Sequence, residues 1–222
     1  MRLTLFDLDG TLLPGDSDHG FGEYLVRLGW VDAEAFRRRN DQFFADYQAG
    51  QLDVNAYVEF STSGWRSRSD AELQALTEGY LRDVIQPMLL PPALALVKRH
   101  QDAGDEVVMV TATIDFITRP ICALFGIQHL IATELELDFA GRVRGTIRGV
   151  PSFREGKVAR VTQWLAERGH TWGDCERSTF YSDSTNDLPL LEHCSHPVAT
   201  NPGAALERIA NERGWPVLKL FT

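Results

Sequence analysis

Short apolar runs alternate with helical patterns along most of this chain, and this alternation restricts the fold more than any other feature. Runs of strand character cover 3–6, 107–110, 179–181 and 197–199. Helical patterns cover 94–100, 116–125 and 158–165. Strands that alternate with helices in this way form βα units of a parallel sheet. The sequence therefore predicts an α/β protein.

The stretch 16–90 interrupts the alternation, because it has helical periodicity and lacks a convincing strand. Ser69 and Glu72 have the spacing of a capping box and precede a helical stripe of Leu73, Leu76, Tyr80 and Val84. We interpret 16–90 as an all-helical cap, similar to a four-helix bundle, inserted after the first strand. Residues 1–15 and 91–222 are predicted to form a Rossmann-like parallel sheet core flanked by helices.

Two smaller interpretations complete the predicted architecture. The segment 134–148 alternates polar and apolar residues around two glycines, which is typical of a β-hairpin. Aromatic residues at helical spacing in the cap, among them Phe43, Tyr47 and Tyr57, are interpreted as bundle core and not as a ligand site.

Composition and charge exclude several classes of protein. The formal charge of -9 argues against a nucleic-acid-binding surface, which needs clustered Lys and Arg. No apolar run approaches the ~18 residues of a membrane span, and no secretory signal pattern is present. Cys122, Cys175 and Cys194 match neither a disulfide framework nor a metal motif. We expect reduced thiols, a cytoplasmic location and no membrane partner, while nothing in the pattern specifies an oligomeric state.

Asp7 and Asp9 stand at the carboxyl end of the first apolar run and are followed directly by Gly10. In open parallel sheets, ligands bind at this edge. Two carboxylates this close repel each other unless a cation lies between them or one of them keeps its proton. The pair therefore indicates a divalent metal, an acid/base pair, or both.

Further polar residues follow the later runs and are expected at the same sheet edge. Thr111 is predicted to end the second strand, and Asp183 and Asp187 follow the third. Lys157 lies in the first turn of a predicted helix, where a cation is unfavourable and so indicates another partner. Each residue could also be a cap or turn former. Together they favour a site for a phosphoryl group and a hard cation such as Mg²⁺.

The segment Asp7-Leu8-Asp9-Gly10-Thr11, followed in order by Thr111, Lys157 and 183–187, resembles the four motifs of the haloacid dehalogenase superfamily. The helical insert directly after the first motif resembles the phosphoserine phosphatase-like branch. The run 15–19 is similar to a bacterial subgroup that includes histidinol-phosphate phosphatases. The resemblance implies a Mg²⁺-dependent phosphatase that hydrolyses a small phosphorylated metabolite beneath a helical lid.

The resemblance also implies the roles of the first two aspartates. Asp7 would be the nucleophile that forms an aspartyl-phosphate, and Asp9 would be the general acid and base. Mg²⁺ would be held by the Asp7 carboxylate, the Asp9 main-chain carbonyl and the Asp183 carboxylate.

Residues of the later motifs would bind and orient the phosphoryl group. The resemblance implies that Thr111 and Lys157 bind its oxygens. Asp187 and Asn186 would lie just behind them, where Asp187 would orient Lys157 or metal-bound water.

Selectivity is expected to come from the cap. Asp16, nine positions after Asp7, matches the acidic residue that binds the substrate amine in phosphoserine phosphatases. His19 is a second candidate, although a histidine there is also typical of a helix cap or a surface. An arginine that binds a carboxylate of the substrate could be Arg37, Arg66 or Arg68. An amine-bearing substrate such as histidinol phosphate or phosphoserine is predicted.

Alternative functions remain open at this point. A phosphotransferase or phosphomutase would use the same aspartyl-phosphate with a second substrate as acceptor. A dehalogenase would not need Asp9. From another class, a non-enzymatic signalling receiver also combines acidic residues, Thr and Lys around Mg²⁺, but its fold is about half this length.

Overall fold

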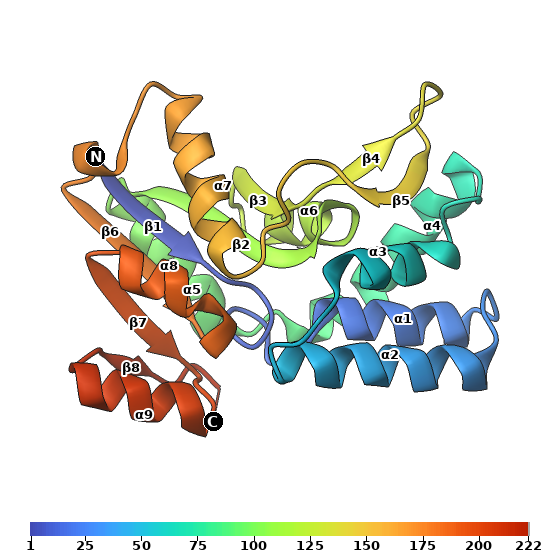
Figure 1. Cartoon of the computed structure of the whole chain (residues 1–222), viewed down its shortest axis with the longest axis horizontal. Helices are drawn as coiled ribbons and strands as arrows, with labels where there is room; N and C mark the ends of the chain where they lie inside the picture. Colours follow the sequence, from blue (N-terminus) through green and yellow to red (C-terminus); the bar gives the residue numbers. More distant parts are fainter. Residues whose placement is uncertain (222) are drawn as a thin grey trace.

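Six parallel strands form the central sheet within residues 1–221, which the computed structural model describes (Figure 1). Their spatial order is β3 (His129–Thr133), β2 (Glu106–Ile114), β1 (Arg2–Phe6), β6 (Arg177–Ser182), β7 (His196–Thr200) and β8 (Val217–Leu218). Each neighbouring pair runs parallel. The predicted α/β class is confirmed, and the central position of β1 places the residues after it in the middle of the carboxyl edge.

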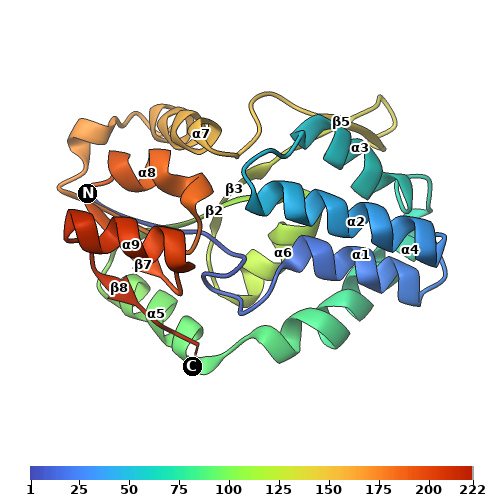
Figure 2. The same ribbon diagram turned by 60° about the horizontal axis from the view of Figure 1, so that its bottom comes forward.

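Successive side chains of β1 point to opposite faces of the sheet, so the core has two layers. Leu3 and Leu5 pack with α7 (Glu155–Ala166), α8 (Leu188–His193) and α9 (Ala204–Arg213). Phe6 points to the other face, which α5 (Pro91–Asp102) and α6 (Asp115–Leu124) cover. Figure 2 shows these two helical layers on opposite sides of the strands. Both faces are buried because successive side chains of a strand point to opposite sides.

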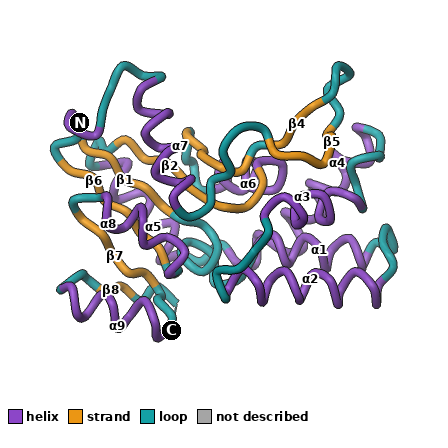
Figure 3. Tube along the Cα trace, viewed as in Figure 1, coloured by secondary structure: helices purple, strands orange, loops and turns teal. Residues whose placement is uncertain are grey.

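The segment between β1 and β2 is helical, as predicted (Figure 3). It contains α1 (Ser17–Arg27), α2 (Ala33–Gln48), α3 (Val54–Ser63) and α4 (Asp70–Tyr80), and then a π-helical turn (Leu81–Ile85) and a 3₁₀ turn (Gln86–Met88). Ser69 and Glu72 form both hydrogen bonds of the predicted capping box at the start of α4. The boundaries of the cap at residues 16 and 90 stay a prediction.

Aromatic packing fixes the cap on the core. Phe116 of α6 stacks on Trp65 of the cap with ring centroids 4.1 Å apart, and Phe21 of α1 meets Phe116 edge-on at 6.2 Å. Buried aromatic pairs of this kind contribute beyond the area they bury. The cap and the α5/α6 face therefore share one apolar cluster, which holds α1 beside the carboxyl ends of β1 and β2.

The strands differ from prediction mainly in extent. β2 continues to Ile114 through an irregularity in its pairing with β3, so the prediction that it ends at Thr111 is wrong. The edge strands β3 and β8 were not predicted, although β3 contains the apolar run 130–132; β8 has only two residues. The predicted hairpin is confirmed as antiparallel β4 (Leu135–Leu137) and β5 (Val143–Ile147).

Every helix among residues 1–221 is too short or too polar to cross a bilayer.

Candidate active site

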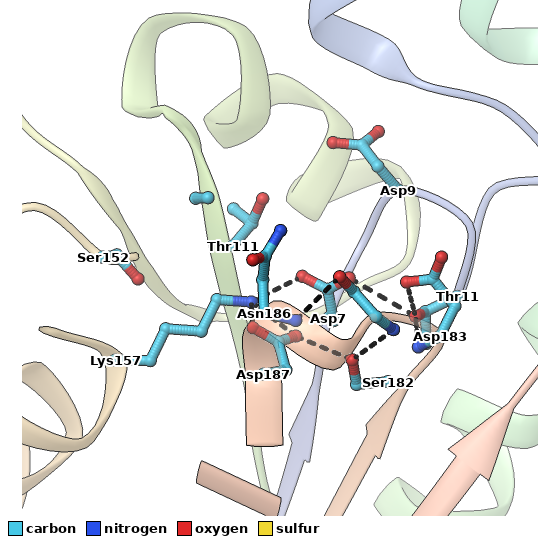
Figure 4. Close-up of polar contacts among 12 residues, drawn as sticks. Asp7, Asp9, Thr11, Thr111, Ser152, Lys157, Ser182, Asp183, Asn186 and Asp187 are labelled. Atoms are coloured by element: carbon cyan, nitrogen blue, oxygen red, sulfur yellow. Dashed lines mark hydrogen bonds and ion pairs between the residues drawn. The ribbon is translucent and has the colours of Figure 1, made fainter. Parts of the chain in front are cut away.

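A buried ammonium group joins two carboxylates at the carboxyl edge of the sheet (Figure 4). Lys157, in the first turn of α7, donates to Asp7 Oδ1 at 2.9 Å and to Asp187 Oδ2 at 2.8 Å. All of these side chains are almost fully buried. The two ion pairs explain why a lysine is tolerated near a helix N-terminus, where the macrodipole alone disfavours it.

The charge of this cluster depends on its burial and its pairing. Burial alone would lower the pKa of Lys157, but the charges of Asp187 and Asp7 raise it above its usual range. Burial raises the pKa of Asp7 to about 6, although Lys157 opposes the shift. Lys157 therefore stays charged and offsets part of the negative charge around it.

Thr11 connects the first motif with the last, and the sequence analysis did not single it out. Its Oγ1 lies 3.4 Å from Asp7 Oδ2 and 3.3 Å from Asp183 Oδ1, and it accepts from the Asp183 main-chain N–H at 3.0 Å. The signal that could have found it is its place inside the first motif. Through this hydroxyl, the Asp7 and Asp183 carboxylates converge.

Convergence of Asp7 and Asp183 fits a divalent cation. Burial and the charge of Asp7 raise the pKa of Asp183, because the two carboxylates repel each other. No three His, Cys, Asp or Glu side chains within residues 1–221 are grouped as metal ligands. Mg²⁺ suits such a sparse set, since it keeps several waters and needs few protein oxygens. The predicted carbonyl of Asp9 would be the third.

Asp9 points away from Asp7 and has a separate environment (Figure 4). It accepts from the Ser17 N–H at 2.6 Å and from Thr113 Oγ1 at 3.0 Å. Burial and the charge of Asp16 raise the pKa of Asp9 well above its usual range. A raised pKa favours the protonated form, which is the form that a general acid needs. Thr113 was not predicted, because β2 was expected to end before it.

The remaining predicted core residues surround this cluster. Thr111 is buried and accepts from the Thr113 N–H at 3.2 Å. Asp187 accepts from Ser182 Oγ at 2.7 Å as well as from Lys157. Asn186 instead reaches the cap, where it donates to the Tyr47 carbonyl at 2.8 Å.

A cavity connects Asp7, Asp9 and Thr111 with the cap. Its cap wall contains carboxylate, imidazole, amide and aromatic side chains: Asp16, Asp18, His19, Asn40, Phe43, Phe44, Tyr47 and Tyr57. Phe43 is buried and packs against Tyr57 and Phe60, as the interpretation as bundle core predicts. Phe43, Tyr47 and Tyr57 also line the cavity, because helical spacing does not distinguish a cavity wall from a packed core. Asp18 was not predicted as a site residue, although it lies in the run that carried the subgroup resemblance.

The two predicted selectivity residues of the cap make local contacts. Asp16 caps α1 by accepting from the His19 N–H at 2.7 Å. The His19 ring lies 2.8 Å from Asp41 Oδ1. Both residues nevertheless line the cavity.

The candidate arginines for a substrate carboxylate lie elsewhere. Arg37 pairs with Glu23 at 2.9 Å, and Arg68 pairs with Glu72 at 3.2 Å. Arg66 lies beside Gly145 of β5. Within the described part of the chain, the lining of the cavity includes neither Lys nor Arg.

Fold and site together define an α/β protein with a helical cap and a buried aspartate–lysine cluster. The chain matches the family of haloacid dehalogenase-like hydrolases over residues 4–192 and belongs to it. It is 46% identical over 217 residues to the histidinol-phosphatase of Neisseria meningitidis serogroup C, covering 98% of each chain.

Solved structures show the same fold. A Bordetella pertussis protein of unknown function is 49% identical and superposes with a TM-score of 0.93 over 99% of each chain. A substrate-bound phosphoserine phosphatase is 15% identical, with a TM-score of 0.69 over 98% of this chain and 92% of that one. The predicted class, a phosphatase of the haloacid dehalogenase superfamily, is confirmed, and the enzyme is favoured over the signalling receiver.

Proposed function

We propose that this enzyme hydrolyses histidinol phosphate, with Asp7 as the nucleophile and Asp9 as the general acid and base. The observation that carries the proposal is the cavity, which joins these aspartates to a cap wall of carboxylates and aromatic rings. The name of the Neisseria meningitidis relative supports the same substrate.

The cap wall suits an alcohol phosphate that carries an ammonium group and an imidazole ring. Asp16 and Asp18 would attract the ammonium group, and Phe43 and Phe44 offer faces on which a flat ring can stack. Phosphoserine carries a carboxylate in place of the imidazolylmethyl group. Because the described lining contains neither Lys nor Arg, that carboxylate would be buried beside other carboxylates, which is costly.

In the first step, an Asp7 oxygen attacks phosphorus in line with the leaving alcohol. The bond from phosphorus to the alcohol oxygen breaks, and its electron pair stays on that oxygen, which takes the proton of Asp9. Lys157 and Thr111 contact phosphoryl oxygens and offset the charge of the transition state. Asp187 positions Lys157 through their ion pair, whereas Asn186 contacts the cap at the Tyr47 carbonyl.

In the second step, water attacks the phosphorus of the aspartyl-phosphate. Asp9 takes a proton from this water, and the bond between phosphorus and the Asp7 oxygen breaks. Inorganic phosphate is released, and both aspartates return to their starting states. Mg²⁺, held by Asp7, Asp183 and the Asp9 carbonyl, would supply positive charge beside the phosphoryl oxygens when bound.

Phosphate release from a panel of metabolites tests the substrate. The panel holds histidinol phosphate, phosphoserine, sugar phosphates and nucleotides. We expect kcat/KM for histidinol phosphate to exceed that for phosphoserine by about 100-fold or more, because a buried unpaired carboxylate costs about 3 kcal/mol. Equal or higher kcat/KM for phosphoserine would refute the substrate, and loss of phosphate to a second substrate would instead identify a phosphotransferase.

Variants of the two aspartates test the division of roles. Asp7→Asn should lower kcat by at least about 1000-fold, because an amide is a poor nucleophile. Asp9→Asn should slow turnover yet still permit a trace of phosphoenzyme, which acid quenching and mass spectrometry can detect. Near-normal turnover in Asp7→Asn, or in Asp9→Asn, would contradict the mechanism.

Cys122, Cys175 and Cys194 are free thiols, which supports the expected cytoplasmic location.

A further inference from the structure

We propose that Asp18 binds the substrate's primary ammonium group and thereby determines selectivity for amine-bearing phosphomonoesters. This inference rests on the proposed function and adds the residue that binds the amine of the substrate. Asp16 and His19 are the residues that the sequence predicts for this contact. The structure favours Asp18 because its carboxylate is buried, lines the cavity and lacks a full set of partners.

The Asp18 carboxylate is prepared for a ligand. The residue is 8% exposed, and its Oδ1 has no hydrogen-bond partner within residues 1–221. Burying an unpaired carboxylate oxygen costs several kcal/mol, so a partner is expected in the functional state. Asp16 differs, because its Oδ1 already accepts the His19 N–H that caps α1.

The surroundings of Asp18 favour a cation. Burial and, to a smaller extent, the charge of Asp16 raise the pKa of Asp18 to about 7, while hydrogen bonding to Tyr57 opposes the shift. An ammonium group placed here would relieve the repulsion between the two carboxylates. The rings of Phe43 and Phe44 line the same cavity.

The backbone sets the position of this ammonium site relative to the reacting group. Asp9 Oδ1 accepts from the N–H of Ser17, which lies between Asp16 and Asp18 at the start of α1. The protonating carboxyl and the Asp18 carboxylate are therefore tied to the same turn of helix. This geometry suits a substrate whose amine lies close to the ester oxygen, as on the carbon next to the one that bears it.

The test compares substrates with and without the amine. Histidinol phosphate is paired with 3-(imidazol-4-yl)propyl phosphate, which lacks only the amine and the charge. In the wild type we expect kcat/KM to favour histidinol phosphate by about 100-fold. In Asp18→Asn this ratio should fall by at least about 30-fold, since a buried charged pair is lost.

Two variants serve as controls for the ratio. Asp70→Asn removes the same charge from an exposed position in α4 and should keep the wild-type ratio. Asp16→Asn should lower the ratio less than Asp18→Asn, because one Asp16 oxygen is occupied by the helix cap. A larger fall in Asp16→Asn, or an unchanged ratio in folded Asp18→Asn, would overturn the proposal.

Measurements on the wild type alone test the ammonium site even if a variant does not fold. They also distinguish failure of this site from failure of the proposed function. Equal kcat/KM for the two imidazole compounds would overturn the ammonium site, whichever variants fold. If histidinol phosphate is not hydrolysed at all, the proposed function fails. The Asp18 site is then tested with 2-aminoethyl phosphate and ethyl phosphate, where loss of the amine preference in Asp18→Asn supports it and equal turnover by the wild type overturns it.

Discussion

At the scale of the residue, Gly10 shows how one backbone conformation lets the first motif lie close to the Asp183 carboxylate. Its φ of +72° lies in the left-handed region, and a Cβ there would lie 2.3 Å from Asp183 Oδ2. Asn201 supports the same turn by donating to the Gly10 and Thr11 carbonyls at 2.9 and 3.1 Å. The first motif therefore needs glycine for its backbone conformation and for the space beside Asp183.

Gly10→Ala should displace Asp183 and lower kcat/KM by about 100-fold or more. Gly104→Ala is the matched control, because Gly104 has a φ of +75° and nothing within 4 Å of its Cβ position. Both variants should lose about 1 kcal/mol of stability from backbone strain. Steady-state kinetics and urea unfolding of both variants check this. Equal activity losses in the two variants would contradict a role for the space beside Asp183.

Asp18 should also affect how stability depends on pH. Its pKa rises from 3.8 to about 7 on folding, with Asp16, Tyr57 and Tyr80 as the facing groups. For a raised carboxyl pKa, stability is highest at low pH and is lost as pH rises through about 4 to 7. Between pH 5 and 8 the loss is about 2–3 kcal/mol.

Asp18→Asn should remove this loss of stability. The unfolding free energy of the variant minus that of the wild type should therefore rise by about 2–3 kcal/mol from pH 5 to pH 8. Urea unfolding at both pH values measures it, with Asp70→Asn as the control. A site built for a ligand is commonly destabilising when the ligand is absent. A pH-independent difference for Asp18→Asn would show that the carboxyl does not titrate as described.

At the scale of the element, one hydrogen bond connects the cap directly with the last motif. Asn186, in the 3₁₀ turn Thr185–Asp187, donates to the carbonyl of Tyr47 near the end of α2. Tyr47 also lines the cavity. The turn that carries Asp187 is therefore hydrogen-bonded to α2, which forms part of the cavity wall.

Asn186→Ala should weaken closure of the cap and raise KM about 5- to 10-fold, the effect of a lost hydrogen bond of about 1–1.5 kcal/mol. Asn211→Ala, an exposed change on α9, should leave KM at the wild-type value. Initial rates and limited proteolysis of the cap check the two variants together. A change in kcat with KM unaltered would indicate that Asn186 acts on the phosphoryl site and not on the cap.

At the scale of the whole molecule, the sheet and cap concentrate negative charge in one buried place. Asp7, Asp9, Asp183 and Asp187 come from two strand ends, and Asp16 and Asp18 come from the cap. Lys157 is the ammonium group paired within this cluster. The excess of carboxylates is consistent with the two cationic ligands that we propose, a divalent metal beside Asp183 and an ammonium group beside Asp18.

EDTA should abolish turnover, and added Mg²⁺ should restore it. Mg²⁺ should also raise the Tm of the metal-free enzyme by several degrees, because ligands that bind the folded state stabilise it. Asp183→Asn should lose most of this thermal shift, whereas Asp70→Asn should keep it. Calorimetry measures the shift apart from activity, and full activity in EDTA would contradict a metal-dependent reaction.

The sequence by itself determined the α/β class, the helical insert and the Asp7/Asp9 motif, because these depend on local periodicity and spacing. It predicted the capping box at Ser69 for the same reason. Its prediction that β2 ends at Thr111 is wrong, since the extent of a strand also depends on pairing with its neighbour.

Only the tertiary structure decided which side chains share the cavity. Tyr47 and Tyr57 have the spacing of core residues, yet both line the cavity. Burial leaves one oxygen of the Asp18 carboxylate without a hydrogen-bond partner among the residues that the structure describes. The Asp16 carboxylate, in contrast, already accepts the hydrogen bond that caps α1. Local sequence specifies an element, but the contacts of a side chain depend on residues far away in the chain.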